Sequence, residues 1–275
     1  MPSVTDKPSG KLTIAFFKCD SLTKESIEEH GEYQDVIHNL FEPLLPKHLS
    51  LETLTYDVLE KREYPKDEEL EKIDAIVISG SFEDEAHSDT RWILKLAGYL
   101  IKIYDEYPRI RILGICFGLQ VIARAFGPSQ IKENSKGWEV GSTRMNLTDI
   151  GKSIYMQQIH SDIVTEVPSD FELLGTSEKC PVQGIVAFYP KDKNPPAFTH
   201  SHHHTLPSEP WCNIHIIAFQ GHPEWHEGII IPFINNYERK GTFDKDFAEE
   251  ARGYTKEHHD GERIGKVLLR ILGVA

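Results

Sequence analysis

The stretch Leu113-Gly114-Ile115-Cys116-Phe117-Gly118-Leu119-Gln120 decides how the rest of the chain is arranged. The apolar run at residues 109–115 predicts a buried parallel strand, and residues 117–126 predict a helix that ends at Gly127-Pro128. Cys116 therefore stands where a strand passes directly into a helix, and the remaining elements can be placed relative to it.

The pattern Gly114-x-Cys116-x-Gly118 is the cysteine form of the G-x-S-x-G nucleophile elbow, in which glycines leave room for the neighbouring strand and helix. A helix N-terminus favours a thiolate over a thiol, and the Phe117 amide can point at an oxyanion formed during attack. A single cysteine after a strand is more often a buried core residue. The two glycines and the change from strand to helix favour a nucleophile.

A second apolar segment, residues 213–220, predicts another buried strand that ends at Gly221-His222-Pro223-Glu224-Trp225. A cysteine nucleophile needs a base, and the base needs a third group that fixes its tautomer. His222 and Glu224 offer both groups. Alone, G-H-P-E is a weak signal, but together with the upstream elbow it becomes a strong one.

These two motifs resemble those of the class I (triad) glutamine amidotransferases, which carry a G-x-C-x-G-x-Q elbow and a distal H-P-E. Within that family, the chain is most similar to the free-standing branch that resembles the GMP synthase amidotransferase domain and the plant γ-glutamyl peptidases. The resemblance spans about residues 70–225, and the matching segments are 76–81, 89–93, 112–120, 137–141, 160–162 and 220–224. One departure is Leu119, where many members have histidine.

The resemblance implies that Cys116 is the nucleophile, His222 the general base and acid, and Glu224 the carboxylate that orients His222. The backbone amides of Gly80 and Phe117 would form the oxyanion hole. The residues implied to line the glutamyl pocket are Gln120, His160, Ser161 and Asp162. The implied reaction is hydrolysis of a γ-glutamyl amide through a thioester, with no cofactor and no metal.

The sequence does not identify the amine that leaves in this reaction. The substrate would be glutamine or a γ-glutamyl peptide such as glutathione or its conjugates. Alternatively, the chain is a glutaminase that delivers ammonia to a separate synthase subunit, or a catalytically silent binding or regulatory module. No acceptor domain is evident in the sequence, so either a separate subunit supplies one or the enzyme acts alone. The solitary length and the resemblance to the plant peptidases favour the γ-glutamyl hydrolase. The intact Cys116, His222 and Glu224 speak against the silent module.

The order of elements predicts an α/β fold with a mostly parallel central sheet flanked by helices on both faces, and the resemblance implies the flavodoxin-like arrangement of its family. Strands are expected at residues 12–17, 51–59, 73–79, 109–115 and 213–220. Helices are expected at residues 32–45, 90–103, 117–126, 227–237 and 261–272. Short antiparallel strands at 137–147 and 184–189 predict a small β-rich insertion. Residues 1–10 are expected to be a disordered lead and 11–275 a single domain.

The composition of the chain argues against some classes of binding partner. The chain has 275 residues and a formal charge of −13 at pH 7, which argues against a nucleic-acid partner. No apolar run is long enough to span a bilayer and the first residues are polar, so we expect a protein of the cytoplasm, or one shared between cytoplasm and nucleus. The four cysteines, at positions 19, 116, 180 and 212, lack C-x-x-C spacing and predict reduced thiols.

Two further segments have less specific interpretations. The histidines at 200 and 202–204 are neighbours in a proline-flanked loop and converge poorly on one ion, so we expect no physiological metal there. The charged stretch at 239–260 predicts a solvated surface or lid, and the sharper alternative is a face that docks a partner.

Overall fold

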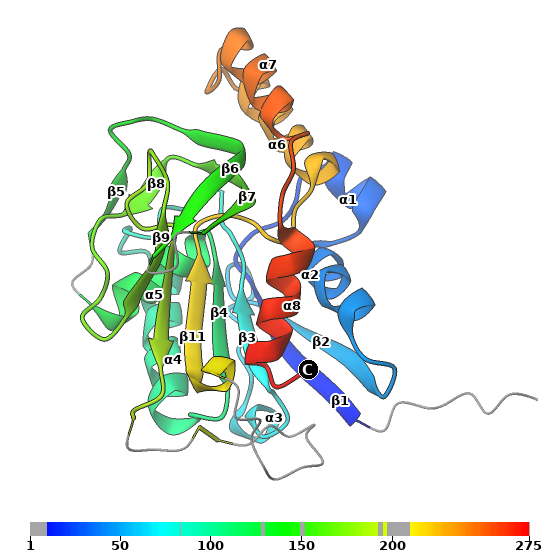
Figure 1. The fold of residues 1–275 in the computed structure, drawn as a ribbon, viewed down its shortest axis with the longest axis vertical. Helices are drawn as coiled ribbons and strands as arrows, with labels where there is room; N and C mark the ends of the chain where they lie inside the picture. Colours follow the sequence, from blue (N-terminus) through cyan, green and yellow to red (C-terminus); the bar gives the residue numbers. More distant parts are fainter. Residues whose placement is uncertain are drawn as a thin grey trace, which may run out of the picture.

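The computed structural model describes residues 10–82, 84–127, 130–148, 152–191, 195–196 and 210–274. Within these residues a nine-stranded sheet runs through the molecule (Figure 1). In sheet order the strands are β2 (Leu49–Asp57), β1 (Gly10–Lys18), β3 (Ala75–Ile78), β4 (Arg111–Ile115), β11 (Ile214–Phe219), β10 (Gly184–Phe188), β9 (Glu172–Thr176), β6 (Glu139–Leu147) and β7 (Ser153–His160).

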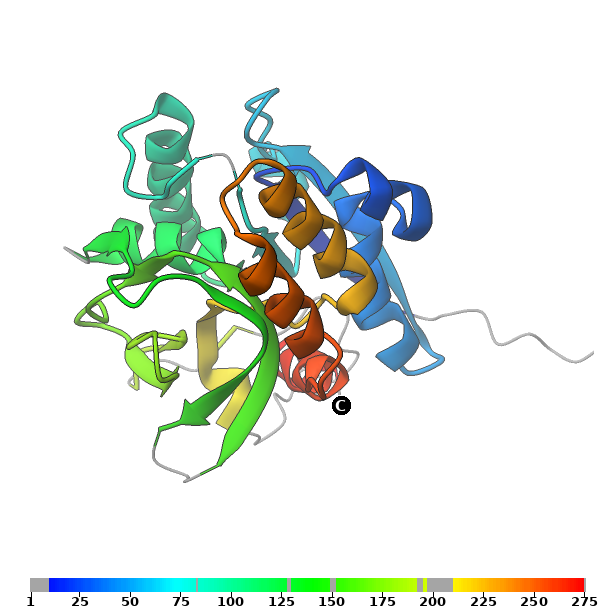
Figure 2. The ribbon, with the colours of Figure 1, turned by 90° about the horizontal axis from the view of Figure 1, so that it is seen from above.

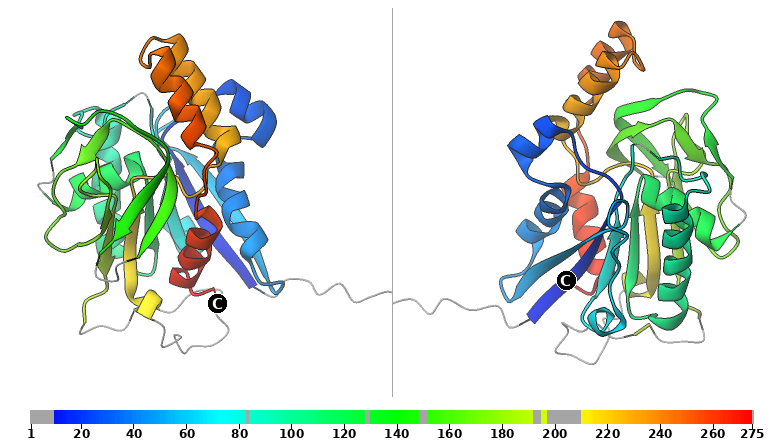
Figure 3. Two further views of the ribbon diagram at one scale, coloured as in Figure 1. Left: turned by 45° about the horizontal axis from the view of Figure 1, so that its top comes forward. Right: turned by 180° about the vertical axis from the view of Figure 1, so that it is seen from behind.

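The first five strands in this order pair in parallel and form the core of the fold. All residues of β3, β4 and β11 are buried, which is why their sequences are nearly continuous apolar runs. The views in Figures 1 and 3 show helices on both faces. Packed on one face are α2 (Tyr33–Phe41) and α8 (Gly261–Ile271), and on the other α4 (Arg91–Glu106) and α5 (Phe117–Phe126). The predicted α/β class is confirmed.

The predicted β-rich region extends the same sheet. Strands β10, β9, β6 and β7 add to the edge of β11 through antiparallel pairs, so the sheet is mixed with a parallel core. A separate two-stranded sheet pairs β5 (Ile131–Glu133) with β8 (Asp162–Val164). The two strands expected in this region correspond to β6 and β10.

Three helices were not among those expected. The short helices are α1 (Lys24–His30), which Thr23 caps by accepting a bond from the Ser26 amide, and α3 (Asp67–Leu70). The third, α7 (Lys245–Tyr254), lies in the charged stretch at 239–260 and is capped by Asp244. It packs against α6 (Glu227–Arg239), and Figure 2 shows α7 beside β6. The pair α6–α7 stands above the carboxyl ends of the parallel strands (Figure 1).

No helix in the described part of the chain combines the length and apolar character needed to cross a membrane. Across those residues no group of three or more His, Cys, Asp or Glu side chains is placed to hold a metal ion. The histidines at 200 and 202–204, and positions 1–9 of the expected lead, lie outside the described residues.

Candidate active site

Cys116 occupies a strained turn between β4 and α5. Its backbone has φ 55° and ψ −107°, a conformation that side chains rarely adopt and that costs about 1–3 kcal/mol. A Cβ atom on Gly114 would lie 2.8 Å from the Gly118 backbone, and one on Gly118 would lie 2.6 Å from the Ile78 carbonyl oxygen of β3. The two glycines therefore allow β4, α5 and β3 to pack closely enough to hold this turn.

His222 and Glu224 follow β11, the strand that pairs with β4. His222 Nδ1 lies 2.8 Å from Glu224 Oε1, and both side chains are fully buried. Because a carboxylate only accepts hydrogen bonds, the proton between the two groups is on Nδ1. Nε2 is therefore the nitrogen that can exchange a proton with a reacting group. Nε2 is buried with no hydrogen-bond partner among the described residues.

The segments after β3, β4 and β11 meet at one point. A Cβ atom on Gly80, after β3, would lie 3.0 Å from His222 Cε1 and 3.6 Å from Cys116 Cβ. The structure therefore brings the three residues together at the carboxyl ends of adjacent parallel strands, where open α/β sheets place their sites.

The electrostatics favour a charged His222. Burial would lower its pKa, but the Glu224 carboxylate and the Cys116 sulfur outweigh burial and raise the pKa to about 10. The ring is stacked on Trp225 with centroids 3.9 Å apart, which fixes its plane. Such an arrangement can support an imidazolium beside a thiolate.

The two predicted oxyanion donors differ in their surroundings. The Phe117 amide is the first of α5, so it has no acceptor inside the helix. The Gly80 amide lies beside Cys116, but it donates to the Tyr33 hydroxyl at 3.4 Å. Gly80 therefore lies beside the Cys116 side chain, but its N–H is directed at Tyr33.

A cavity of about 230 Å³ opens at Cys116. Its walls include all four residues predicted to line the glutamyl pocket, namely Gln120, His160, Ser161 and Asp162. Ser81 and Trp138 lie in segments that match the family, but no pocket role was predicted from the sequence for the other lining residues: Ser81, Phe82, Asp84, Glu85, Trp138, Ile159 and Tyr237. They come from the loop after β3, the approach to β6, β7 and α6, so only the tertiary structure identifies them.

Gln220 is a site residue that the sequence reasoning did not assign. Its Nε2 donates to Cys116 Sγ at 3.5 Å, and its Oε1 accepts from Gln120 Nε2 at 3.2 Å. Gln120 Nε2 also donates to the Asp162 carbonyl at 3.1 Å, which fixes the orientation of both amides. The available signal was a polar residue at the end of an otherwise apolar strand, two positions before His222.

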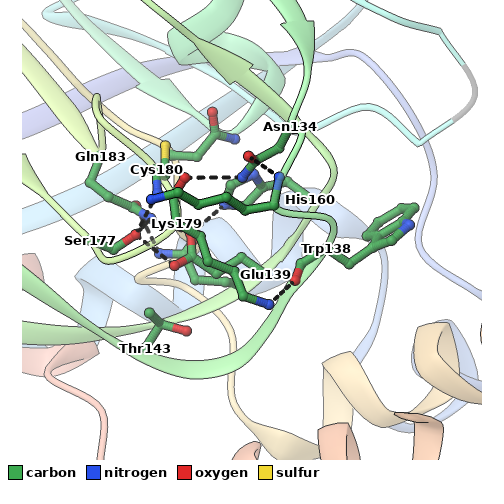
Figure 4. A network of polar contacts seen from close by, with 12 residues as sticks. Asn134, Trp138, Glu139, Thr143, His160, Ser177, Lys179, Cys180 and Gln183 are labelled. Carbon is green, nitrogen blue, oxygen red and sulfur yellow. Dashed lines mark hydrogen bonds and ion pairs between the residues drawn. The ribbon is translucent and has the colours of Figure 1, made fainter.

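A buried network behind the pocket holds His160 (Figure 4). His160 Nδ1 donates to the Asp162 carbonyl at 3.0 Å, and Nε2 lies 3.1 Å from Glu139 Oε2. Glu139 also accepts from Ser177 and Gln183, each at 2.6 Å. Although burial would raise the pKa of Glu139, hydrogen bonding and charge from His160 hold it below its usual value. His160 and Glu139 thus form a buried polar pair that supports the turn at Ser161.

Comparison with known proteins shows the family of the chain. A family profile described as glutamine amidotransferase class-I matches residues 32–203. The chain belongs to the class I glutamine amidotransferase family. A glutamine amidotransferase-like protein of Schizosaccharomyces pombe is 30% identical over 269 residues, covering 94% of this chain and 98% of that protein.

Other similar class I glutamine amidotransferases and related proteins are more distant. Gamma-glutamyl peptidase 2 of Arabidopsis thaliana is 29% identical over 213 residues, covering 74% of each chain. The crystal structure of a glutamine amidotransferase from Thermotoga maritima covers 95% of this chain and 96% of its own, with a TM-score of 0.62 and 17% identity. That structural likeness supports the fold alone.

Proposed function

We propose that this class I glutamine amidotransferase-like protein is a cysteine hydrolase that cleaves a γ-glutamyl amide through a γ-glutamyl thioester. The observation that carries the proposal is the buried, hydrogen-bonded His222–Glu224 pair, which interacts with Cys116 on a strained strand-to-helix turn. A nucleophile, a base and an orienting carboxylate in this order are the parts that acyl transfer needs.

In the first step, the Cys116 thiolate attacks the γ-carbonyl carbon of the glutamyl group. A carbon–sulfur bond forms and the carbonyl electrons move to oxygen. The Phe117 amide holds this oxyanion, joined by the Gly80 amide when it turns from Tyr33. Each such donor stabilises the transition state by about 3 kcal/mol in comparable hydrolases.

In the second step, the tetrahedral species collapses. His222 Nε2 gives its proton to the departing nitrogen, the carbon–nitrogen bond breaks and the thioester remains. His222 then takes a proton from water, which attacks the thioester carbon, and glutamate leaves as the thiolate is restored. Glu224 keeps the proton on Nδ1 throughout, so Nε2 is the nitrogen that exchanges protons.

The glutamyl group would lie against Gln120, His160, Ser161 and Asp162. The contacts of this set suggest two kinds of contribution. Gln120 and His160 both donate to the Asp162 carbonyl and hold the turn, whereas the Ser161 hydroxyl and the Asp162 carboxylate suit the α-carboxylate and α-ammonium of the substrate. The similarity to gamma-glutamyl peptidases supports a γ-glutamyl substrate rather than an unrelated amide.

The test is glutamate release by the purified chain, given glutamine and several γ-glutamyl amides, with Cys116→Ala alongside. Cys180→Ala is the matched control because it removes another buried thiol, whose pKa burial raises to about 12. We expect Cys116→Ala to abolish release and Cys180→Ala to retain it. Substantial release by a folded Cys116→Ala variant would sink the proposal.

A further inference from the structure

On the basis of the proposed function, we infer that the enzyme prefers γ-glutamyl amides whose amine part carries a positive charge over those whose amine part ends in a carboxylate. This inference names the substrate class of the Cys116 pocket. It is carried by the charges and aromatic rings that line the pocket.

The lining of the pocket is acidic. Asp84, Glu85 and Asp162 contribute carboxylates, and no lysine or arginine is among the described residues that line the cavity. His160, the histidine in the lining, faces a further carboxylate, since its Nε2 lies 3.1 Å from Glu139 Oε2 (Figure 4). Three carboxylates around one small cavity set up a field that attracts cations and repels anions.

Each of the three carboxylates has a polar partner in the structure. Trp92 Nε1 donates to Asp84 at 2.8 Å, which anchors the loop after β3. His87 lies between the other two acids, with Nε2 3.1 Å from Glu85 and Nδ1 3.9 Å from Asp162. His87 therefore links Glu85, in the loop after β3, to Asp162 at the start of β8.

Three aromatic side chains, Phe82, Trp138 and Tyr237, form another part of the wall. Trp138 and Tyr237 have ring centroids 5.1 Å apart, and Phe243 packs against both. Phe82 stacks on Trp225 near His222. Because aromatic faces attract ammonium groups, this wall and the carboxylates favour the same kind of ligand. Lys179 is not part of this lining: its ammonium donates to the Trp138 carbonyl, and the residue lines a different groove.

The expected preference depends on the net charge of the substrate and not on its exact pose in the cavity. The glutamyl part carries one ammonium and one carboxylate, so the net charge of the substrate is that of its amine part. The amine part of glutathione ends in a carboxylate, which the acidic lining repels. An amine part with a second ammonium gains attraction from the same groups.

The experiment uses three γ-glutamyl amides of similar length, made from 1,4-diaminobutane, butylamine and 4-aminobutanoate. Only the charge at the far end differs. The values of kcat/KM are measured at low ionic strength and at one fixed pH of 8. We expect them to fall in that order, by about fivefold for each step of charge.

Two variants test whether a pocket carboxylate causes the preference for a positive charge. Glu85→Gln removes one pocket charge and should reduce the ratio of diamine to carboxylate kcat/KM by about threefold, a modest change because Glu85 is 65% exposed. The control Glu68→Gln removes an exposed carboxylate on α3, at the opposite end of the sheet, and should leave the ratio unchanged.

Equal kcat/KM values for the three substrates, or the highest value for the carboxylate substrate, would overturn the inference. The proposed hydrolase function would still stand. The same holds if none of the three is cleaved while glutamine is hydrolysed in a Cys116-dependent manner. Absence of Cys116-dependent release from all four compounds would overturn the inference and the proposed function together.

Discussion

The Tyr33 hydroxyl donates to Glu224 Oε1 at 3.0 Å, and the same oxygen lies 2.8 Å from His222 Nδ1. Tyr33 is fully buried on α2, far from Glu224 in the sequence. Its oxygen also accepts from the Gly80 amide. Tyr33 therefore joins the carboxylate that orients His222 to the loop that carries one predicted oxyanion donor, and it acts as a positioning residue.

Replacing Tyr33 by phenylalanine keeps the ring and removes only these bonds. We expect Tyr33→Phe to lower kcat by about tenfold, since Glu224 loses a donor, and to lower the free energy of unfolding by about 1–2 kcal/mol. Steady-state kinetics and urea denaturation measure both quantities. A variant with an unchanged kcat would show that the bond to Glu224 does not position the triad.

The Glu224 carboxylate should matter more than Tyr33. Glu224→Gln keeps the shape of the side chain but loses the charge that favours imidazolium, so we expect kcat to fall by about 10²-fold or more. The comparison is kcat for Glu224→Gln and for Glu227→Gln, which removes an exposed carboxylate at the start of α6. Equal activities in the two variants would contradict the proposed role of Glu224.

The same carboxylate predicts a pH dependence of stability. Burial opposes protonation of His222, yet Glu224 and Cys116 raise its pKa from 6.5 to about 10 in the folded chain. Protonation therefore stabilises the fold fully below about pH 6.5, and this contribution is lost as pH rises toward 10. Across that window the free energy of unfolding should fall more in the native chain than in Glu224→Gln. Parallel curves from urea denaturation would argue against the raised pKa.

The elbow can be tested with two glycine substitutions. Gly118→Ala would place a Cβ 2.6 Å from the Ile78 carbonyl oxygen, so we expect a loss of about 2 kcal/mol or more and disrupted activity. Gly98→Ala is the matched control, because a Cβ there meets no atom within 4 Å and the residue lies inside α4. It should stabilise by about 0.5–1 kcal/mol. Similar effects at the two sites would refute the close packing at the elbow.

Gln220 should affect the reactivity of the nucleophile. Gln220→Leu removes the amide that donates to Cys116 Sγ, so the thiolate loses a stabilising bond. We expect the pH profile of alkylation at Cys116 to shift upward, and Gln220→Glu to shift it further by adding a negative charge. A rate of iodoacetamide reaction with the same pH profile in all three proteins would exclude this role.

The central motifs could be predicted because they are local. Glycines two positions on either side of a strand-to-helix change indicate an elbow, and H-P-E after an apolar strand indicates its partner. By contrast, Tyr33 reaches Glu224 and Tyr237 reaches the pocket only through the packing of α2 and α6. Nor does sequence reveal the direction of the Gly80 amide, which depends on the peptide orientation.

Some elements were missed for physical reasons that the structure reveals. Strand β7 contains Gln157 and Gln158, which are fully buried because Gln157 bonds the Thr255 carbonyl and Gln158 bonds Gln183. These polar residues interrupt the apolar pattern that predicts a strand. Helix α7 buries only Ala248 and Ala251 among its ten residues, so its sequence is that of a charged surface.

The most direct measurement is peptide mapping by mass spectrometry after reaction with a glutamine analogue that carries a diazoketone in place of the γ-amide. Such a compound alkylates a nucleophile that binds the glutamyl group. The proposed function predicts one label on the peptide that contains Cys116, blocked by excess glutamine and reduced in His222→Asn. An unlabelled Cys116, or equal labelling of Cys19, Cys180 and Cys212, would contradict the assignment of Cys116 as the nucleophile.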